Sequence, residues 1–184
     1  MPHLNIELKA RCDDLERLHR LLLEENAEQR GTDNQRDTYF KVPNGRLKLR
    51  EGTIERSLIQ YDRPDQAGPK ASQVSLYHPG PDNPDDPRTT SAVLRATLLR
   101  ALGELVTVEK RRRIYFIDNV KFHLDEVPGL GSFVEIEAID ADGSIGEARL
   151  REQCERYMHL FDIKADDLIE RSYSDMLLGL RGGR

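Results

Sequence analysis

The chain has 184 residues, of which 33% are charged and 38% hydrophobic, and its formal net charge is -5. This length suits a single domain, spanning residues 1–184, with a core of its own. Nucleic-acid-binding domains are usually basic, so the acidic balance argues against a nucleic acid partner. The apolar runs are too short for a membrane span, and the N-terminus lacks a secretion signal. We therefore expect a cytoplasmic protein with no membrane partner.

The first predicted element is a strand over residues 5–11, in which apolar and charged side chains alternate. Successive side chains of a strand point to opposite faces, so Glu7, Lys9 and Arg11 share one face and the apolar residues share the other. A capped helix is expected next, over about residues 13–26, because leucines recur there at helical spacing.

The middle of the chain is typical of an antiparallel meander with tight turns. Its strands are expected over residues 38–42, 46–50, 54–62 and 73–77. A loop over residues 63–72 and an acidic, proline-rich excursion over residues 78–88 interrupt the pattern.

The second half predicts helices over about residues 91–102 and 145–161, with strands over residues 106–117, 121–127 and 132–139 between them. Short helical pieces are expected to close the chain. Lys110 and Arg112 share one strand face, whereas Arg111 and Arg113 point to the opposite face and are expected in solvent.

The charged strand faces decide how these elements assemble. In an ordinary antiparallel sheet the charged face points to solvent, and this simpler arrangement stays open. Here, carboxylates are concentrated on two strands and cations on several others. That distribution suits an α+β fold built on a closed antiparallel eight-stranded β-barrel, with a charged interior and with helices against its apolar outer face.

Several motifs stand out along these strands: Asn5-Ile6-Glu7-Leu8-Lys9, Leu47-Lys48-Leu49-Arg50-Glu51, Glu109-Lys110-Arg111-Arg112, Gly129-Leu130-Gly131 and Glu135-Ile136-Glu137. Together they resemble the CYTH superfamily, also called triphosphate tunnel metalloenzymes, over nearly the whole chain. Asn5 departs from the family's Glu-x-Glu-x-Lys strand, where a Glu stands at this position. Arg171-Ser172-Tyr173 is more similar to the class IV adenylate cyclase branch than to the animal thiamine triphosphatases. The resemblance implies the tunnel form of the barrel.

Carboxylates from two strands suit a hard divalent cation, because such cations prefer oxygen ligands. With the resemblance, the expected cofactor is Mg²⁺ or Mn²⁺, and the expected ligands are Glu7, Asp125, Glu135 and Glu137. Without the resemblance, surface glutamates paired with neighbouring cations would explain the same pattern. Glu7 and Lys9 are the expected catalytic residues.

Arginine binds phosphate through a planar fork and lysine binds it as a point charge. The expected phosphate contacts are Lys9, Arg11, Lys48, Arg50, Arg63, Lys70, Lys110 and Arg112. His123 is expected to fill space in a strand. No histidine has a base and an orienting partner at recognisable spacing, so catalysis is expected to depend on positioning and charge neutralisation.

The resemblance implies a partner that carries a triphosphate, namely ATP, tripolyphosphate or thiamine triphosphate, and the cyclase branch suggests a homodimer. A class IV adenylate cyclase would convert ATP to cyclic AMP and pyrophosphate. A triphosphate hydrolase, either an inorganic tripolyphosphatase or a thiamine triphosphatase, would use water as the nucleophile in the same tunnel. A polyphosphate- or nucleotide-binding protein without catalysis is the third hypothesis, motivated by Asn5.

Overall fold

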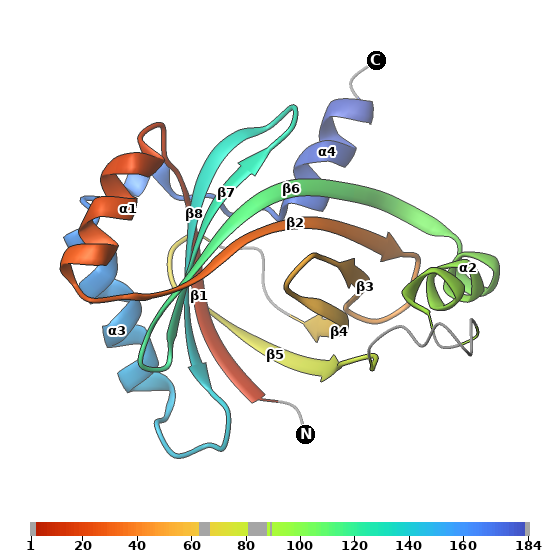
Figure 1. Ribbon diagram of the computed structural model, residues 1–184, viewed down its shortest axis with the longest axis horizontal. Coiled ribbons are helices and arrows are strands. Elements are labelled where there is room, and N and C mark those ends of the chain that lie inside the picture. Colours follow the sequence, from red (N-terminus) through yellow and green to blue (C-terminus); the bar gives the residue numbers. More distant parts are fainter. Residues whose placement is uncertain (1–2, 63–66, 81–87, 89, 183–184) are drawn as a thin grey trace.

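The computed structural model describes residues 3–62, 67–80, 88 and 90–182 (Figure 1). Within these residues there are eight strands: β1 (His3–Arg11), β2 (Glu28–Phe40), β3 (Arg46–Glu51), β4 (Arg56–Asp62), β5 (Lys70–Tyr77), β6 (Glu104–Ile117), β7 (Val120–Val127) and β8 (Gly131–Asp140). They close into a barrel in the order β1-β5-β4-β3-β2-β6-β7-β8, and all neighbours are antiparallel. The predicted α+β barrel fold is confirmed.

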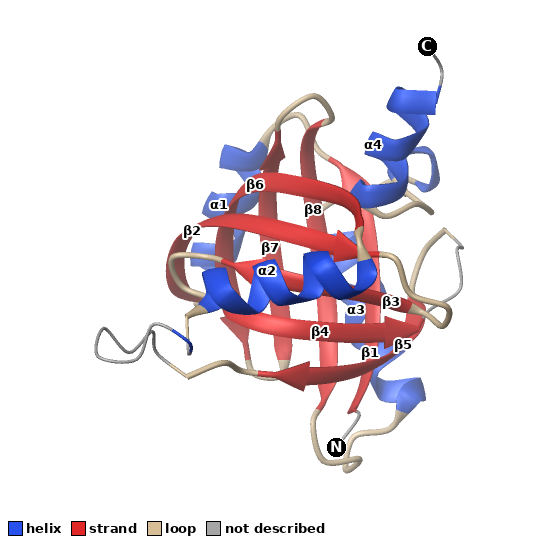
Figure 2. Ribbon diagram, turned by 90° about the vertical axis from the view of Figure 1, so that its right-hand side faces the viewer, coloured by secondary structure: helices blue, strands red, loops and turns tan. Residues whose placement is uncertain are grey.

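Helices flank this barrel. The α-helices in the described part of the chain are α1 (Leu15–Glu24), α2 (Ser91–Leu102), α3 (Glu147–Leu160) and α4 (Tyr173–Gly182). Figure 1 shows α1 and α3 together on one side of the barrel, next to β1, β7 and β8. Figure 2 shows α2 crossing the opposite side, near β2. No helix among the described residues has the length and apolar character needed to cross a membrane.

The helix ends follow local capping chemistry. The Asp14 side chain accepts a hydrogen bond from the backbone N–H of Arg17, 2.8 Å away, at the start of α1. Thr90 caps α2 in the same way through the backbone N–H of Val93, at 3.3 Å. Gly103 ends α2 with a φ of 77°, a backbone conformation that glycine adopts without steric cost.

The outward face of β1 forms part of the main apolar core. Ile6 and Leu8 belong to one buried cluster with Leu18 and Leu22 of α1 and Leu150 of α3. Burying each such side chain contributes about 1.5–3 kcal/mol to stability. Because strand side chains alternate, this outward apolar face turns the polar side chains of β1 toward the barrel interior.

The strand β2 is much longer than the one predicted over residues 38–42, because it begins at Glu28. Residues 28–37 contain none of the hydrophobic residue types. Their inward face is polar instead, and Asp33, Gln35 and Asp37 are buried. A search for apolar alternation misses a strand whose inward face is polar.

The boundaries of other strands also differ from the prediction. β5 begins at Lys70, inside the segment predicted as a loop, because Lys70 pairs with Glu7 of β1 and extends the sheet. β4 begins at Arg56 rather than at residue 54. Residues 63–66 and 81–87, which belong to the predicted loop and excursion, lie outside the described residues.

Candidate active site

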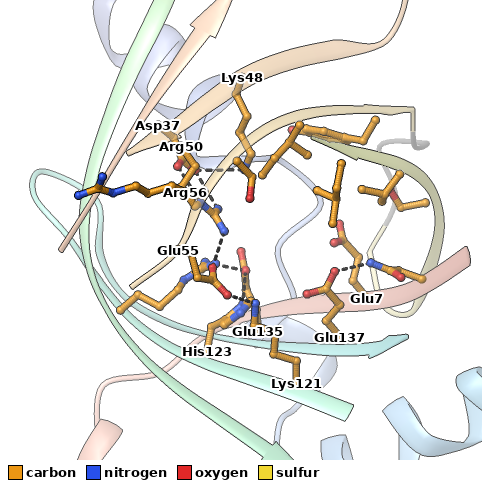
Figure 3. Close-up of a pocket in the computed structure, with 18 of the residues that line it drawn as sticks. Glu7, Asp37, Lys48, Arg50, Glu55, Arg56, Lys121, His123, Glu135 and Glu137 are labelled. Carbon is orange, nitrogen blue, oxygen red and sulfur yellow. Dashed lines mark hydrogen bonds and ion pairs between the residues drawn. The ribbon is translucent and has the colours of Figure 1, made fainter. Parts of the chain in front are cut away.

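The inward strand faces enclose a cavity of about 620 Å³. Figure 3 shows charged side chains pointing into it from several strands. Its wall contains most of the site residues expected from the sequence, namely Glu7, Lys48, Arg50, Lys110, Arg112, Glu135 and Glu137. The barrel therefore brings together residues that lie up to 130 positions apart in the sequence.

Three expected phosphate contacts, Lys9, Arg11 and Lys70, are not part of the cavity wall, and a fourth, Arg63, is not placed. Arg11 is exposed and donates a hydrogen bond to the Leu130 carbonyl at 3.2 Å, away from the cavity wall. Lys70 is buried, and its Nζ donates to the Glu170 carbonyl at 2.9 Å. Arg63 lies outside the described residues.

Asp37 is the centre of the largest cation cluster. Its carboxylate lies 2.7 Å from Lys110 Nζ, 2.9 Å from Arg50 Nε and 3.1 Å from Lys48 Nζ. Burial alone would raise the pKa of Asp37, but these three charges outweigh it and hold the pKa well below its usual range. The aspartate therefore stays ionised and fixes three cations at the wall.

Lys110 is a titratable member of this cluster. Burial lowers its pKa to about 7, and the nearby charges of Arg50, Arg112 and Lys48 act in the same direction against the opposing effect of Asp37. An anionic ligand in the cavity would stabilise its protonated form.

Arg112 organises a second cluster. Its Nε donates to Asp125 Oδ1 at 2.6 Å, and its Nη2 donates to Glu135 Oε2 at 2.8 Å. Asp125 also accepts a hydrogen bond from the Tyr173 hydroxyl at 2.7 Å and is fully buried. The structure thus places Asp125, an expected metal ligand, behind Arg112, where it orients the guanidinium group.

Glu135 is engaged by further groups. Lys9 Nζ lies 2.9 Å from its carboxylate and 3.5 Å from the centre of the Tyr173 ring. His123 Nδ1 lies 3.0 Å from Glu135 Oε2. Burial would raise the pKa of Glu135, but Lys9 and Arg112 hold it well below the usual value. Burial and the Arg112 charge lower the pKa of His123 to about 3, so this histidine is neutral at neutral pH.

Glu7 and Glu137 form a different environment on neighbouring strands. They are direct partners in the β1–β8 register, and Figure 3 shows both side chains pointing into the cavity. The Asn5 amide donates to Glu137, whereas the buried Asn5 Oδ1 has no hydrogen-bond partner among the described residues. Burial raises the pKa of Glu137, and the nearby Glu7 adds to this effect against the opposing charge of Lys121.

These oxygens fit a divalent cation. No three His, Cys, Asp or Glu side chains in the described ranges converge closely enough to hold a metal by themselves. Mg²⁺, however, commonly takes only one or two carboxylates and completes its shell with water and substrate phosphate. Glu7, Glu137 and Asn5 Oδ1 supply such a partial set of oxygen ligands, and a cation there would offset the charge that raises the pKa of Glu137.

Four charged residues of the wall were not predicted from the sequence: Asp37, Glu55, Arg56 and Lys121. Asp37 lies on β2 two residues after the inward-facing Gln35, so a period-two pattern of polar residues could have indicated it. Glu55 and Lys121 form an ion pair between segments 66 residues apart, which no local pattern predicts.

Another part of the wall is apolar. Tyr39, Ile59, Tyr61 and Val74 are at most 8% exposed and line the same cavity as the charged groups. The barrel interior thus offers a charged surface for the oxygens of an anion and an apolar surface for an organic group.

A closed antiparallel barrel with lysines, arginines and carboxylates on the wall of an internal cavity defines a tunnel-type anion-binding protein. The chain belongs to the CYTH domain family, whose model matches residues 3–173. Membership of this family supports a function in a triphosphate tunnel.

Similar proteins agree with this assignment. The chain is 27% identical over 172 residues to adenylate cyclase CyaB of Aeromonas hydrophila, covering 91% of this chain and 85% of that protein. A solved structure from Pyrococcus horikoshii has a TM-score of 0.74 at 22% identity, covering 93% of this chain and 98% of the other. A Hippeastrum protein described as having a dominant triphosphatase activity has a TM-score of 0.55 at 17% identity, covering 99% and 96%. The two solved structures support the fold.

Proposed function

We propose that the protein is a metal-dependent enzyme acting on a triphosphate held in the cavity, most like a class IV adenylate cyclase. In that reaction the 3′ hydroxyl of ATP attacks the α-phosphorus, cyclic AMP forms and pyrophosphate leaves. The proposal rests on one observation: Lys48, Arg50 and Lys110 surround a buried carboxylate in the same cavity that Glu7 and Glu137 enter.

The cations would bind the phosphate chain. Arg50 and Arg112 offer planar forks to phosphate oxygens, and Lys48 and Lys110 act as point charges. Ion pairs to Asp37, Asp125 and Glu135 already orient these cations in the wall. Such prior orientation means that little reorganisation is needed when charge develops on the phosphate during transfer.

Glu7 and Glu137, with Asn5 Oδ1, are the groups that would hold Mg²⁺ or Mn²⁺. When bound, the metal ion would neutralise charge on the phosphate oxygens. Lys9 lies beside Glu135 and is not part of the cavity wall, so we assign it a positioning role through that carboxylate.

The apolar wall favours ATP over inorganic tripolyphosphate. A purely inorganic chain would leave Ile59, Tyr61 and Val74 facing water inside the barrel. A purine and ribose would cover part of this surface, and burying apolar area contributes about 25 cal/mol per Å².

The second candidate is a triphosphate hydrolase, in which water attacks the terminal phosphorus. The charged wall suits the phosphate chain whatever organic group it carries, and the Hippeastrum protein with dominant triphosphatase activity shares the fold. Binding without turnover is the third candidate, since Asn5 is neutral where the resemblance places a carboxylate.

Product analysis separates these functions. The purified protein is incubated with Mg²⁺ or Mn²⁺ and either ATP or tripolyphosphate, and the products are resolved by ion-exchange chromatography. Cyclic AMP with pyrophosphate from ATP supports the cyclase. Orthophosphate with ADP from ATP, or orthophosphate with pyrophosphate from tripolyphosphate, supports the hydrolase. Tight binding without either product would contradict both enzymatic assignments. Arg50→Met should abolish turnover, whereas the control Arg111→Gln, whose side chain is 51% exposed, should retain it.

A further inference from the structure

The turn between β3 and β4 is fixed to the buried Asp33 of β2. Asp33 accepts hydrogen bonds from the Ile54 N–H at 2.9 Å, the Glu55 N–H at 3.0 Å and the Thr53 hydroxyl at 3.0 Å. Gly52 packs so closely that a Cβ there would lie 2.6 Å from both Asp33 oxygens. The backbone of this turn is therefore held in one position.

This fixed turn carries the Glu55 side chain into the cavity. The Glu55 carboxylate lies 3.0 Å from Arg50 Nη1 of β3, accepts from Gln35 at 3.2 Å, and forms an ion pair with Lys121 of β7. In the barrel order, β3 and β7 are separated by β2 and β6. Glu55 thus bridges two well-separated parts of the wall (Figure 3).

The bridge is ionic rather than a neutral hydrogen bond. Burial would raise the pKa of Glu55, but the charges of Lys121 and Arg50 outweigh it and hold the pKa below the usual range. The Glu55 side chain is 22% exposed, so the carboxylate is not enclosed by protein on every side. A ligand in the cavity meets this carboxylate next to the two cations.

We propose that Glu55 is an internal competitor of the ligand, an anion that occupies the Arg50–Lys121 cation pair and that a ligand phosphate must displace. The inference rests on the proposed function only in taking a polyphosphate as the ligand. Because Asp33 fixes the turn, the displacement is a rotation of the Glu55 side chain. The backbone keeps its position.

Displacement has different consequences for long and short anions. A triphosphate that displaces Glu55 still contacts other cations of the wall, such as Lys48 and Lys110, which offsets the lost ion pairs. Orthophosphate gains few such contacts and pays the same displacement cost. Glu55 therefore lowers the affinity for both kinds of anion by the same factor, and only the long chain keeps enough contacts with the other cations to bind at low concentration.

The test measures binding of tripolyphosphate, pyrophosphate and orthophosphate by isothermal titration calorimetry, without any turnover. Glu55→Gln keeps the shape of the side chain and removes its charge. Removing a like charge a few ångströms from the ligand relieves the same cost for each anion, so orthophosphate, pyrophosphate and tripolyphosphate should each bind about tenfold more tightly. The control Glu126→Gln removes one carboxylate from an exposed pair with Arg111 and should leave all three affinities unchanged.

Weaker or unchanged binding by Glu55→Gln, with normal binding by the wild type, would overturn the inference and leave the proposed function standing. If neither the wild type nor the variants bind any polyphosphate, both the inference and the proposed function are overturned.

A second measurement needs no variant. The carboxyl carbon resonance of Glu55 is followed by NMR in the wild-type protein during titration with tripolyphosphate. The Glu55 resonance should shift, whereas the backbone amide of Ile54 should be as protected from hydrogen exchange with the ligand as without it. A resonance that does not move at saturation would refute displacement.

Discussion

Lys110 Nζ lies 2.7 Å from the Asp37 carboxylate, and each side chain is only 1% exposed. Such a pair is costly to bury and contributes little net stability by itself, yet removing one partner leaves a buried charge without compensation. Asp37 serves Lys48 and Arg50 as well. One aspartate thus pairs with three cations and offsets only part of their charge, and a ligand can supply further negative charge.

Asp37→Asn should therefore destabilise the protein strongly. Removing one member of a buried ion pair costs about 3–5 kcal/mol in free energy of unfolding. Urea denaturation at neutral pH, followed by circular dichroism, measures this change. Glu126→Gln removes an exposed pair with Arg111 and should cost less than about 1 kcal/mol. Similar losses in the two variants would contradict the role given to Asp37.

Acid should weaken the fold through the same carboxylates. In the folded protein the pKa values of Asp37 and Glu135 lie well below their usual range. Their stabilising contribution is complete above the unfolded-state values of about 4 and is lost as the pH falls through the folded-state values. Free energies of unfolding measured from about pH 6 downward should fall below about pH 4. Asp37→Asn should show a shallower fall, and parallel curves would contradict this explanation.

Binding of a polyanion should take up a proton at Lys110. Its pKa of about 7 means that much of Lys110 is neutral at pH 8, and a bound phosphate would raise that pKa. Calorimetry in buffers of different ionisation enthalpy should show more proton uptake at pH 8 than at pH 6. Lys110→Arg stays charged at both pH values and should lose this difference. Equal uptake by the two proteins would assign the proton to another group.

Metal binding should depend on Glu137. Glu137→Gln removes a carboxylate at the Glu7–Glu137 pair and should weaken Mn²⁺ binding on the order of tenfold or more. Electron paramagnetic resonance of free Mn²⁺ measures the affinity, and circular dichroism checks the fold. Glu126→Gln, far from this pair in the barrel register, should bind as the wild type does. Wild-type affinity in Glu137→Gln would remove this residue from the metal site.

The barrel itself was largely predictable, because β1, β3 and β8 alternate apolar and charged side chains as expected, and the segments of β6 and β7 were also predicted as strands. An apolar outer face under α1 and α3 follows directly from that alternation. The long β2 was not predictable by the same criterion. Its inward residues, Asp33, Gln35 and Asp37, form hydrogen bonds and ion pairs, and hydrophobic periodicity cannot detect them because they are polar.

The site was predictable only in part, for a related reason. Strand parity places Lys48, Arg50, Lys110 and Arg112 on inward faces, and the cavity wall contains all four. Parity cannot tell which carboxylate meets which cation, because that depends on the register between strands distant in sequence. Asp125 therefore lies behind Arg112, and Glu55 reaches Lys121 from a turn that carries no motif.

The most direct test of the account is a crystal structure of the protein with Mn²⁺ and a non-hydrolysable ATP analogue, with Mn²⁺ located by anomalous scattering. We expect a Mn²⁺ peak coordinated by Glu7 and Glu137, with the phosphate chain contacting Arg50 and Lys110 inside the barrel. A triphosphate and metal bound outside the barrel, with Asp37 and its cations unchanged, would contradict it.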